Sequence, residues 1–291
     1  MRERKKPYIM LISSLVIVGT IGVFRRYIPL SSSLLAFFRG VIGSASLLAY
    51  VALFKKGRRQ RVEGKKLAAM IVNGAFLGIN WILLFEAFNY TTIAKATLAY
   101  YMQPTIVLLL SPLLFRERLT VKKLLCAAAA LLGMVLVSGV VGSAGGAGQD
   151  GKGILFGLGA ACFYALVVIL NKKIEGVEPY RKTIVQLLAS AAALIPYLLI
   201  RGEFARLSFD AGALWLVLLV GVVHTGLVYA LFFGSMGALK AQTISALTYV
   251  DPVTAMIVSA LVLGERLSLL GLIGAALILG SAAVGEMGRK E

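Results

Sequence analysis

Three charged side chains stand alone inside long apolar stretches of this sequence. They are Arg39, Glu86 and Asp251, and the other Lys, Arg, Asp and Glu residues lie between such stretches or near the chain ends. A charge within a bilayer is costly and usually faces protein or water. Arg39 and Glu86 are expected at similar depth near the outer ends of their stretches. They predict an extracellular gate, or an Arg anchor for a substrate carboxylate with Glu86 as proton carrier. The alternatives are a structural ion pair that ties neighbouring helices, or an Arg39 side chain that extends to the lipid headgroups.

Two polar residues precede prolines within apolar stretches. These are Asp251-Pro252 and Gln103-Pro104. Proline removes a backbone donor and loosens the preceding helical turn, which leaves carbonyl groups available to a ligand or ion. We expect both dipeptides to line a cavity, with Pro104 and Pro252 as hinges. The alternative is a pair of packing kinks whose polar groups are satisfied internally.

The only histidine, His224, also lies in the middle of an apolar stretch. Such a side chain can titrate near physiological pH and couple transport to protons, although it can equally be a hydrogen-bonded packing residue. Aromatic side chains with polar tips suit a pocket for amphipathic small molecules. The tyrosines can instead bridge helices through their hydroxyls. The remaining candidates for the transport pathway are Asn80, Trp81, Tyr100, Tyr101, Tyr164, Tyr229 and Tyr249.

Motifs for other chemistry are missing from the sequence. It contains no CxxC, HExxH or phosphate-binding glycine loop, and its 2 cysteines, Cys126 and Cys162, lie in apolar stretches. We therefore expect no metal, no cofactor and no enzyme activity. A membrane-embedded enzyme, which needs clustered acids or metal ligands, and a non-transporting scaffold are the alternatives from other classes.

The elements that must position these residues are membrane-spanning helices. Hydrophobic residues make up 59% of the 291 residues, and they form runs of the length that a helix needs to cross a bilayer. This pattern excludes a soluble globular enzyme and predicts an all-α membrane protein. The ten expected spans are 8–24, 34–54, 67–89, 96–115, 124–141, 153–170, 183–200, 212–235, 241–263 and 268–285.

Basic residues predict the orientation of these spans. With the N-terminus inside, the inner segments hold 22 Lys and Arg and the outer segments hold 7. Because cytoplasmic loops carry the excess of Lys and Arg, we expect a multi-pass plasma-membrane protein with both termini in the cytoplasm. The net charge of +17 therefore reflects topology, and no nucleic-acid partner is expected.

The two halves of the chain repeat each other. Shifting the sequence by 148 residues places Tyr101 and Pro104 on Tyr249 and Pro252, and 11 of 31 positions across 101–131 match. Each half holds five spans, so the second half must enter the membrane upside down. Inverted repeats are typical of secondary transporters. We expect a first repeat at 1–142, a Gly-rich linker at 143–151 and a second repeat at 152–291.

The residues also resemble a known family. Ala36-Phe-Phe-Arg39, the run from Asn89 to Pro104 and the turn Phe115-Arg-Glu-Arg-Leu-Thr120 are similar to the drug/metabolite transporter superfamily, EamA type. A second copy runs from Gly237 to Pro252 and continues at Gly264-Glu-Arg-Leu267. The resemblance implies ten helices in two inverted five-helix repeats and the transport of amino acids, other metabolites or drugs. Gln186 stands near the repeat position of Arg39, which makes that pair asymmetric.

The sequence thus predicts a secondary transporter that works by alternating access. It is expected to export small metabolites or amino acids, with possible proton coupling through Glu86, Asp251 or His224. A multidrug exporter of broad specificity is the alternative within the transport class. The expected partners are a small-molecule substrate and the lipid bilayer, and a monomer or a homodimer is compatible with the repeats.

Overall fold

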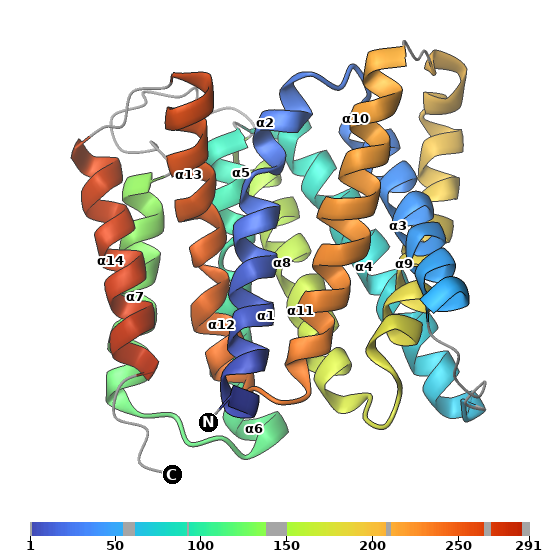
Figure 1. Ribbon diagram of the computed structural model, residues 1–291. Coiled ribbons are helices and arrows are strands. Elements are labelled where there is room, and N and C mark those ends of the chain that lie inside the picture. The colour runs from blue at the N-terminus through green and yellow to red at the C-terminus, as the bar shows by residue number, and fades with distance from the viewer. Residues whose placement is uncertain are drawn as a thin grey trace.

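The computed structural model describes residues 2–54, 62–91, 93–137, 150–207, 211–264 and 269–286. Every regular element in these ranges is helical, and most helices stand side by side along one common direction (Figure 1). The all-α fold class is confirmed. The expected Gly-rich linker at 143–151 lies almost entirely outside the described residues.

The first half of the chain forms helices α1 to α7, and the second half forms α8 to α14. The first half contains α1 (Arg2–Gly19), α2 (Ile21–Arg26), α3 (Ser32–Phe54), α4 (Gly64–Tyr90), α5 (Ile93–Tyr100), α6 (Gln103–Phe115) and α7 (Val121–Val137). The second half contains α8 (Asp150–Lys173), α9 (Pro179–Ile200), the short 3₁₀-helix η1 (Glu203–Arg206), α10 (Ala211–Gly221), the π-helical turn η2 (Val222–Leu227), α11 (Val228–Met236), α12 (Ala241–Thr248), α13 (Val250–Leu263) and α14 (Leu269–Glu286).

Eight of the ten expected spans are long and apolar enough to cross a membrane within the described ranges. Several are built from two or three consecutive helices, such as α10, η2 and α11, which form the span Gly212–Met236. The expected spans 124–141 and 268–285 correspond to α7 and α14. Both are shorter apolar helices in the described ranges: α7 has 17 residues, and the apolar part of α14 runs over Leu269–Ala282.

The two halves interlock rather than standing apart. Helix α4 packs mainly on α8 and α9, α3 packs on α9, α1 packs on α11 and α13, and α7 pairs with α14. In Figure 1 the start of α1 and the end of α14 lie at the same face of the bundle, which fits an even number of spans. We call this face the N-terminal face and the opposite one the far face.

Two spans are interrupted at equivalent places. Helix α5 ends at Tyr100 and α6 begins at Gln103, while α12 ends at Thr248 and α13 begins at Val250. Pro104 and Pro252 each lie in the first turn of the second half-helix, where proline is tolerated because its missing N–H has no helical partner. The expected bends therefore coincide with helix breaks. Both second half-helices end on a left-handed residue, Arg116 at φ 54° and Gly264 at φ 68°.

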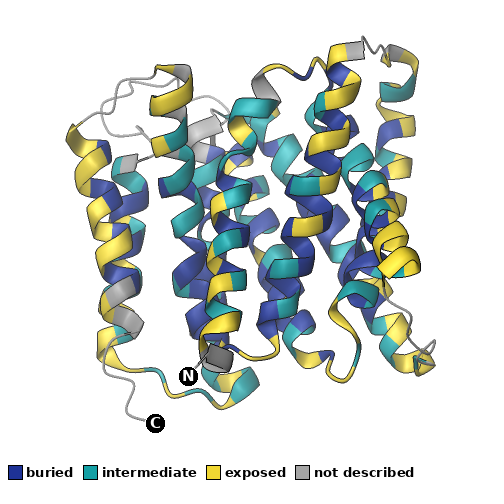
Figure 2. Ribbon diagram, viewed as in Figure 1, coloured by how far each residue is buried: buried dark blue, intermediate teal, exposed yellow. Residues whose placement is uncertain are grey.

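Close helix contacts depend on small residues. A Cβ placed on Gly78 of α4 would lie 2.8 Å from the Cβ of Ala193 on α9, and Gly74 one turn earlier meets the α9 backbone even more closely. Between membrane helices, packing and polar contacts replace the hydrophobic drive, so such small residues set the approach. The outward sides of the helices are largely exposed and apolar (Figure 2), as expected for a surface that faces lipid.

Candidate functional site

Asp251 is held at the interrupted helices in the middle of the bundle. It lies in the first turn of α13, and its Oδ2 accepts a 2.8 Å hydrogen bond from the hydroxyl of Tyr101, the residue that follows α5. The bond joins the first half of the chain to the second. Tyr101 is buried, whereas Asp251 keeps intermediate exposure. The carboxylate is therefore anchored by one phenol and keeps acceptor capacity for a further donor.

Hydroxyl groups of the second repeat bond backbone carbonyls at the break between α5 and α6 and in the first turn of α6. The Tyr249 hydroxyl donates to the Tyr101 carbonyl at 3.3 Å and lies 3.1 Å from the Thr105 hydroxyl. The Ser245 hydroxyl donates to the Pro104 carbonyl. These contacts are those expected of a packing kink, so Pro104 and Pro252 shape the site through the neighbours that they orient. Gln103 and Pro252 are both buried at these breaks.

Arg39 reaches the π-helical turn of the second repeat. Its Nε donates a 2.9 Å hydrogen bond to the hydroxyl of Thr225, which lies in η2 and is fully buried. The wider turn of a π-helix, a feature that recurs at functional sites, carries Thr225 and His224 at adjacent positions. Sequence reasoning missed Thr225, since an isolated threonine in an apolar span carries no signal.

Glu86 and Arg39 have different partners in the described residues, so the alternative of an Arg39–Glu86 ion pair is not formed there, and their role as a gate stays a prediction. The Glu86 carboxylate instead pairs with Arg201 and accepts a 2.8 Å hydrogen bond from the Tyr197 hydroxyl. This contact ties α4 to the end of α9 at the far face. The Glu86 hydrogen bond raises the pKa of the Arg201 guanidinium, so Arg201 remains protonated. Similar depth along two helices fixes height alone, and the rotation of each helix decides which neighbour a side chain meets.

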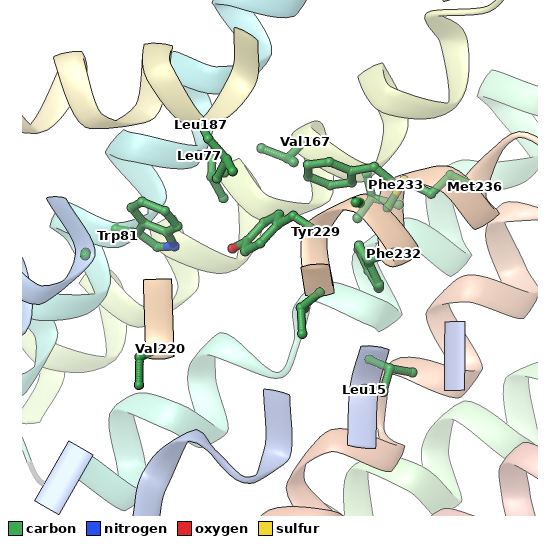
Figure 3. Packing of buried hydrophobic residues seen from close by; sticks show 14 of the residues in the cluster. Leu15, Leu77, Trp81, Val167, Leu187, Val220, Tyr229, Phe232, Phe233 and Met236 are labelled. Carbon is green, nitrogen blue, oxygen red and sulfur yellow. The ribbon is translucent and has the colours of Figure 1, made fainter. Parts of the chain in front are cut away.

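Aromatic side chains occupy the space between Arg39 and Asp251. The rings of Tyr100 and Tyr164 lie 5.9 Å apart, and those of Trp81 and Tyr229 lie 6.4 Å apart. In Figure 3 the Tyr229 hydroxyl points toward the indole of Trp81. Tyr100 and Tyr229 each interact electrostatically with both Arg39 and Asp251. The structure thus brings both charges and most of the predicted aromatic residues into one cluster, which we call the tyrosine cluster. Its members are Arg39, Trp81, Tyr100, Tyr101, Tyr164, Tyr229 and Asp251.

His224 and Asn80 lie beside the tyrosine cluster, since His224 interacts electrostatically with Arg39 and Asn80 interacts with Tyr100. His224 Nε2 lies 2.8 Å from the Thr20 hydroxyl at the break between α1 and α2, and the imidazole packs edge-on against Phe24. The described residues show no contact between His224 and Asp251, and the buried Nδ1 of His224 has no hydrogen-bond partner among them. Asn80 donates to the Ala160 carbonyl of α8 at 2.6 Å, while its buried Oδ1 has no hydrogen-bond partner in the described part of the chain. Both side chains hold one half of the chain against the other.

The tyrosine cluster presents two opposite charges that do not neutralise each other. In the part of the chain that the structure describes, neither Arg39 nor Asp251 has an ion-pair partner. Both are of intermediate exposure although they sit on central helices. The described residues contain no group of His, Cys, Asp and Glu that could hold a metal ion. The arrangement is suited to bind a small molecule with an anionic end, a cationic or hydrogen-bonding end and an apolar body.

Fold and site together define a class. The described ranges are all helical, many of their helices are long and apolar enough to cross a membrane, and the two halves of the chain meet at a polar cluster. The profile of the EamA-like transporter family matches residues 5–139 and again residues 151–284. The chain belongs to the EamA-like transporter family.

Similar proteins are also named as transporters. The chain is 31% identical over 283 residues to the uncharacterized transporter YxxF of Bacillus subtilis, covering 97% of this chain and 90% of that protein. It is 30% identical over 275 residues to an uncharacterized transporter of Archaeoglobus fulgidus, with 94% of each chain covered. A crystal structure that is 22% identical superposes with a TM-score of 0.82 over 98% of this chain and 99% of that one. This last likeness shows the fold.

Proposed function

We propose that this transporter is a secondary exporter of small amphipathic metabolites, amino acids included, and that it works by alternating access. The observation that carries the proposal is the pairing of an unneutralised Arg39 with an unneutralised Asp251 inside one aromatic cluster at the repeat interface. A charge among membrane helices that lacks an ion-pair partner is unfavourable, so a dipolar ligand that meets both groups is the natural occupant. The proposal places the protein in the plasma membrane with both termini in the cytoplasm, in line with the distribution of its basic residues.

The roles follow from the contacts. Arg39 is held by Thr225 and can offer its remaining N–H groups to a substrate carboxylate, since a guanidinium binds a carboxylate in bidentate geometry. Asp251 is held by Tyr101 and can accept from a substrate ammonium group. The rings of Trp81, Tyr100 and Tyr229 provide the surface for an apolar body. Every polar contact in this set joins the two repeats, so a relative movement of the repeats rearranges the site.

Flux from proteoliposomes tests this proposal. Vesicles are loaded with a mixed panel of amino acids and small metabolites, an inward proton gradient is imposed, and the compounds that leave are identified by mass spectrometry. Selective, gradient-dependent loss of one compound class supports a coupled exporter. Loss without gradient dependence would make the protein a facilitator. Loss of chemically unrelated compounds would favour a multidrug exporter, and no loss of any compound would count against the proposal.

A matched pair of ligands isolates the role of Arg39. For an amino acid that is transported, we expect Arg39→Gln to lower its flux at least tenfold, since a charge-assisted hydrogen bond of about 1.5–3 kcal/mol is lost. The corresponding decarboxylated amine should be unaffected by Arg39→Gln and should instead depend on Asp251. Equal losses for both ligands would remove Arg39 from the role of carboxylate anchor.

Proton coupling belongs to the same proposal. Glu86, Asp251 and His224 are the candidate carriers, and each is replaced singly by Glu86→Gln, Asp251→Asn and His224→Gln. Gradient-driven flux that persists in all three variants would exclude coupling through these groups. Because Glu86 pairs with Arg201 and His224 contacts Thr20, we expect Asp251→Asn to have the largest effect on gradient dependence.

A further inference from the structure

A cavity lies beside Tyr249, whose hydroxyl reaches the backbone of Tyr101 in the tyrosine cluster. It has a volume of about 90 Å³ and is enclosed by four helices, α6 and α7 from the first repeat and α12 and α14 from the second. The same Tyr249 hydroxyl lies against Thr105, which also lines the cavity. Its lining includes Lys123 and Lys240, next to the starts of α7 and α12, which lie at the N-terminal face (Figure 1).

Its charged lining is entirely basic. Lys240, exposed, immediately precedes α12, and Lys123, partly exposed, lies in the first turn of α7. The Lys123 ammonium donates to the side-chain oxygen of Gln242 and to the Arg118 carbonyl. No carboxylate is part of the lining in the described ranges. The neighbouring carboxylate of Glu117 is already bonded, since its two oxygens accept from the backbone N–H groups of Ala241 and Gln242.

The rest of the lining combines hydroxyl groups with a small apolar wall. Thr105, Thr243 and Ser281 contribute hydroxyls, and Leu108, Ala130 and Ala246 contribute apolar surface. Gln242 is fixed further by its 2.7 Å hydrogen bond to the buried Ser111. A cavity with cationic groups at its mouth, hydroxyls along its sides and an apolar wall matches an anion that carries an apolar part.

We infer that this cavity is a binding site for an organic anion, a carboxylate or a phosphate attached to a small apolar group, with Lys240 and Lys123 as the cationic contacts. This anion site is separate from the substrate site proposed at the tyrosine cluster, so the inference goes beyond the proposed function. The anion has two possible sources, the head of an anionic lipid and a soluble compound from the N-terminal side. Both place the negative charge between the two lysines.

The chain carries its own reporter for this site. Cys126 lines the cavity, whereas Cys162 is exposed on α8. In the Cys162→Ser variant, the rate of Cys126 modification by the anionic sulfonatoethyl methanethiosulfonate is compared with the rate for the cationic trimethylammonioethyl reagent. We expect the anionic reagent to be favoured about tenfold relative to its preference for a small free thiol in solution, because a positively lined cleft concentrates anions by tenfold or more. The Cys126→Ser variant is the matched control, and it should show no modification that follows this preference.

The lysines are tested in the same assay. Lys240→Gln and Lys123→Gln should each reduce the preference for the anionic reagent, and Lys240→Arg should retain it. The glutamine variants are first checked for monodispersity and thermal stability. Lys240→Gln keeps the cavity wall intact, since this side chain lies at the exposed mouth. An unchanged reagent preference in the double glutamine variant would overturn the inference.

Occupancy separates the two sources. Protection of Cys126 by benzoate or inorganic phosphate in phosphatidylcholine nanodiscs, lost in the double glutamine variant, supports a soluble anion. Protection that requires added phosphatidylglycerol supports a lipid head group. Equal protection by benzylamine, or no protection under either condition, would contradict an anion site. None of these readouts depends on flux, so failure here is distinguishable from failure of the exporter proposal.

Discussion

At the scale of single residues, the tyrosine cluster depends on charges that are hydrogen-bonded but not paired. Asp251 has one donor in Tyr101, and Arg39 has one acceptor in Thr225. Each bond crosses between the repeats, so each contributes both to folding and to the shape of the site. A partly satisfied charge in this position keeps hydrogen-bonding capacity for a ligand at some cost in stability.

We expect Tyr101→Phe to destabilise the protein through Asp251. The variant removes the only hydrogen bond to the carboxylate that is seen in the described residues, and loss of a bond to a charged group costs about 1.5–3 kcal/mol. The melting temperature of the purified protein should fall clearly.

The double-mutant cycle supplies the control for this prediction. In an Asp251→Asn background the same Tyr101→Phe change should lower the melting temperature less, because contacting residues are coupled. Equal shifts in the two backgrounds would mean that Tyr101 acts through ring packing alone.

Residue identity was easier to predict than residue partnership. The sequence identified Arg39, Asp251 and the tyrosines as candidates because charges and phenols are unusual inside apolar spans. It paired Arg39 with Glu86 from depth along the helices, and the structure gives them Thr225 and Arg201 instead. Helix rotation is set by packing, for which close contacts such as that at Gly78 are responsible. Packing also brings Lys123 and Gln242 together, although they are 119 residues apart. No feature of the sequence predicts their hydrogen bond.

At the scale of elements, the second half-helices α6 and α13 end alike. Arg116 adopts φ 54° where the other repeat has Gly264 at φ 68°. A non-glycine residue in this left-handed region costs about 1 kcal/mol or more. We therefore expect Arg116→Gly to stabilise the protein by about 1 kcal/mol, measured as a rise in melting temperature.

The matched control for this change is Arg116→Ala. It removes the same side chain but keeps a Cβ, so it should give no comparable gain. A rise of the same size in both variants would show that the Arg116 side chain, and not its backbone conformation, is unfavourable.

The start of α12 depends on a carboxylate from the other repeat. Glu117 accepts from the N–H groups of Ala241 and Gln242 at 2.9 and 3.2 Å, and an anion at a helix N-terminus satisfies unpaired donors and the helix dipole. Glu117→Gln should cost about 1 kcal/mol, seen as a lower melting temperature and faster amide exchange at 241–244. Unchanged exchange in this segment would show that other groups hold the helix start.

The prolines predicted the helix breaks at 101–102 and 249 correctly because proline cannot supply an interior backbone donor. The π-helical turn at Val222–Leu227 was not predictable in this way. Its sequence contains no proline, and the turn is defined by partners on other helices, Arg39 and Thr20. The repeat equivalent of Glu117 is Glu265, which lies outside the described residues.

At the scale of the whole molecule, polar contacts join the repeats near both faces. At the far face Glu86 of α4 contacts Arg201 and Tyr197. At the N-terminal face Glu117 and Lys123 contact the start of α12. Alternating access requires the contacts of one face to break while those of the other persist. The exposed Arg201 side chain, at 46% relative accessibility, makes the far-face contact weak enough for this, since exposed ion pairs contribute about 0–1 kcal/mol.

Fixing the far-face contact should therefore stop transport without unfolding the protein. In a background with Cys126→Ser and Cys162→Ser, the changes Glu86→Cys and Arg201→Cys are combined and bridged by a short bis-methanethiosulfonate reagent. A flexible reagent is used because two long side chains separate the backbones here. We expect substrate flux to be abolished on bridging and restored by dithiothreitol, while each single-cysteine variant shows the same flux before and after treatment with the reagent. Full flux in the bridged protein would mean that the far face opens elsewhere, and that the Glu86–Arg201 pair is a fixed tie between α4 and α9.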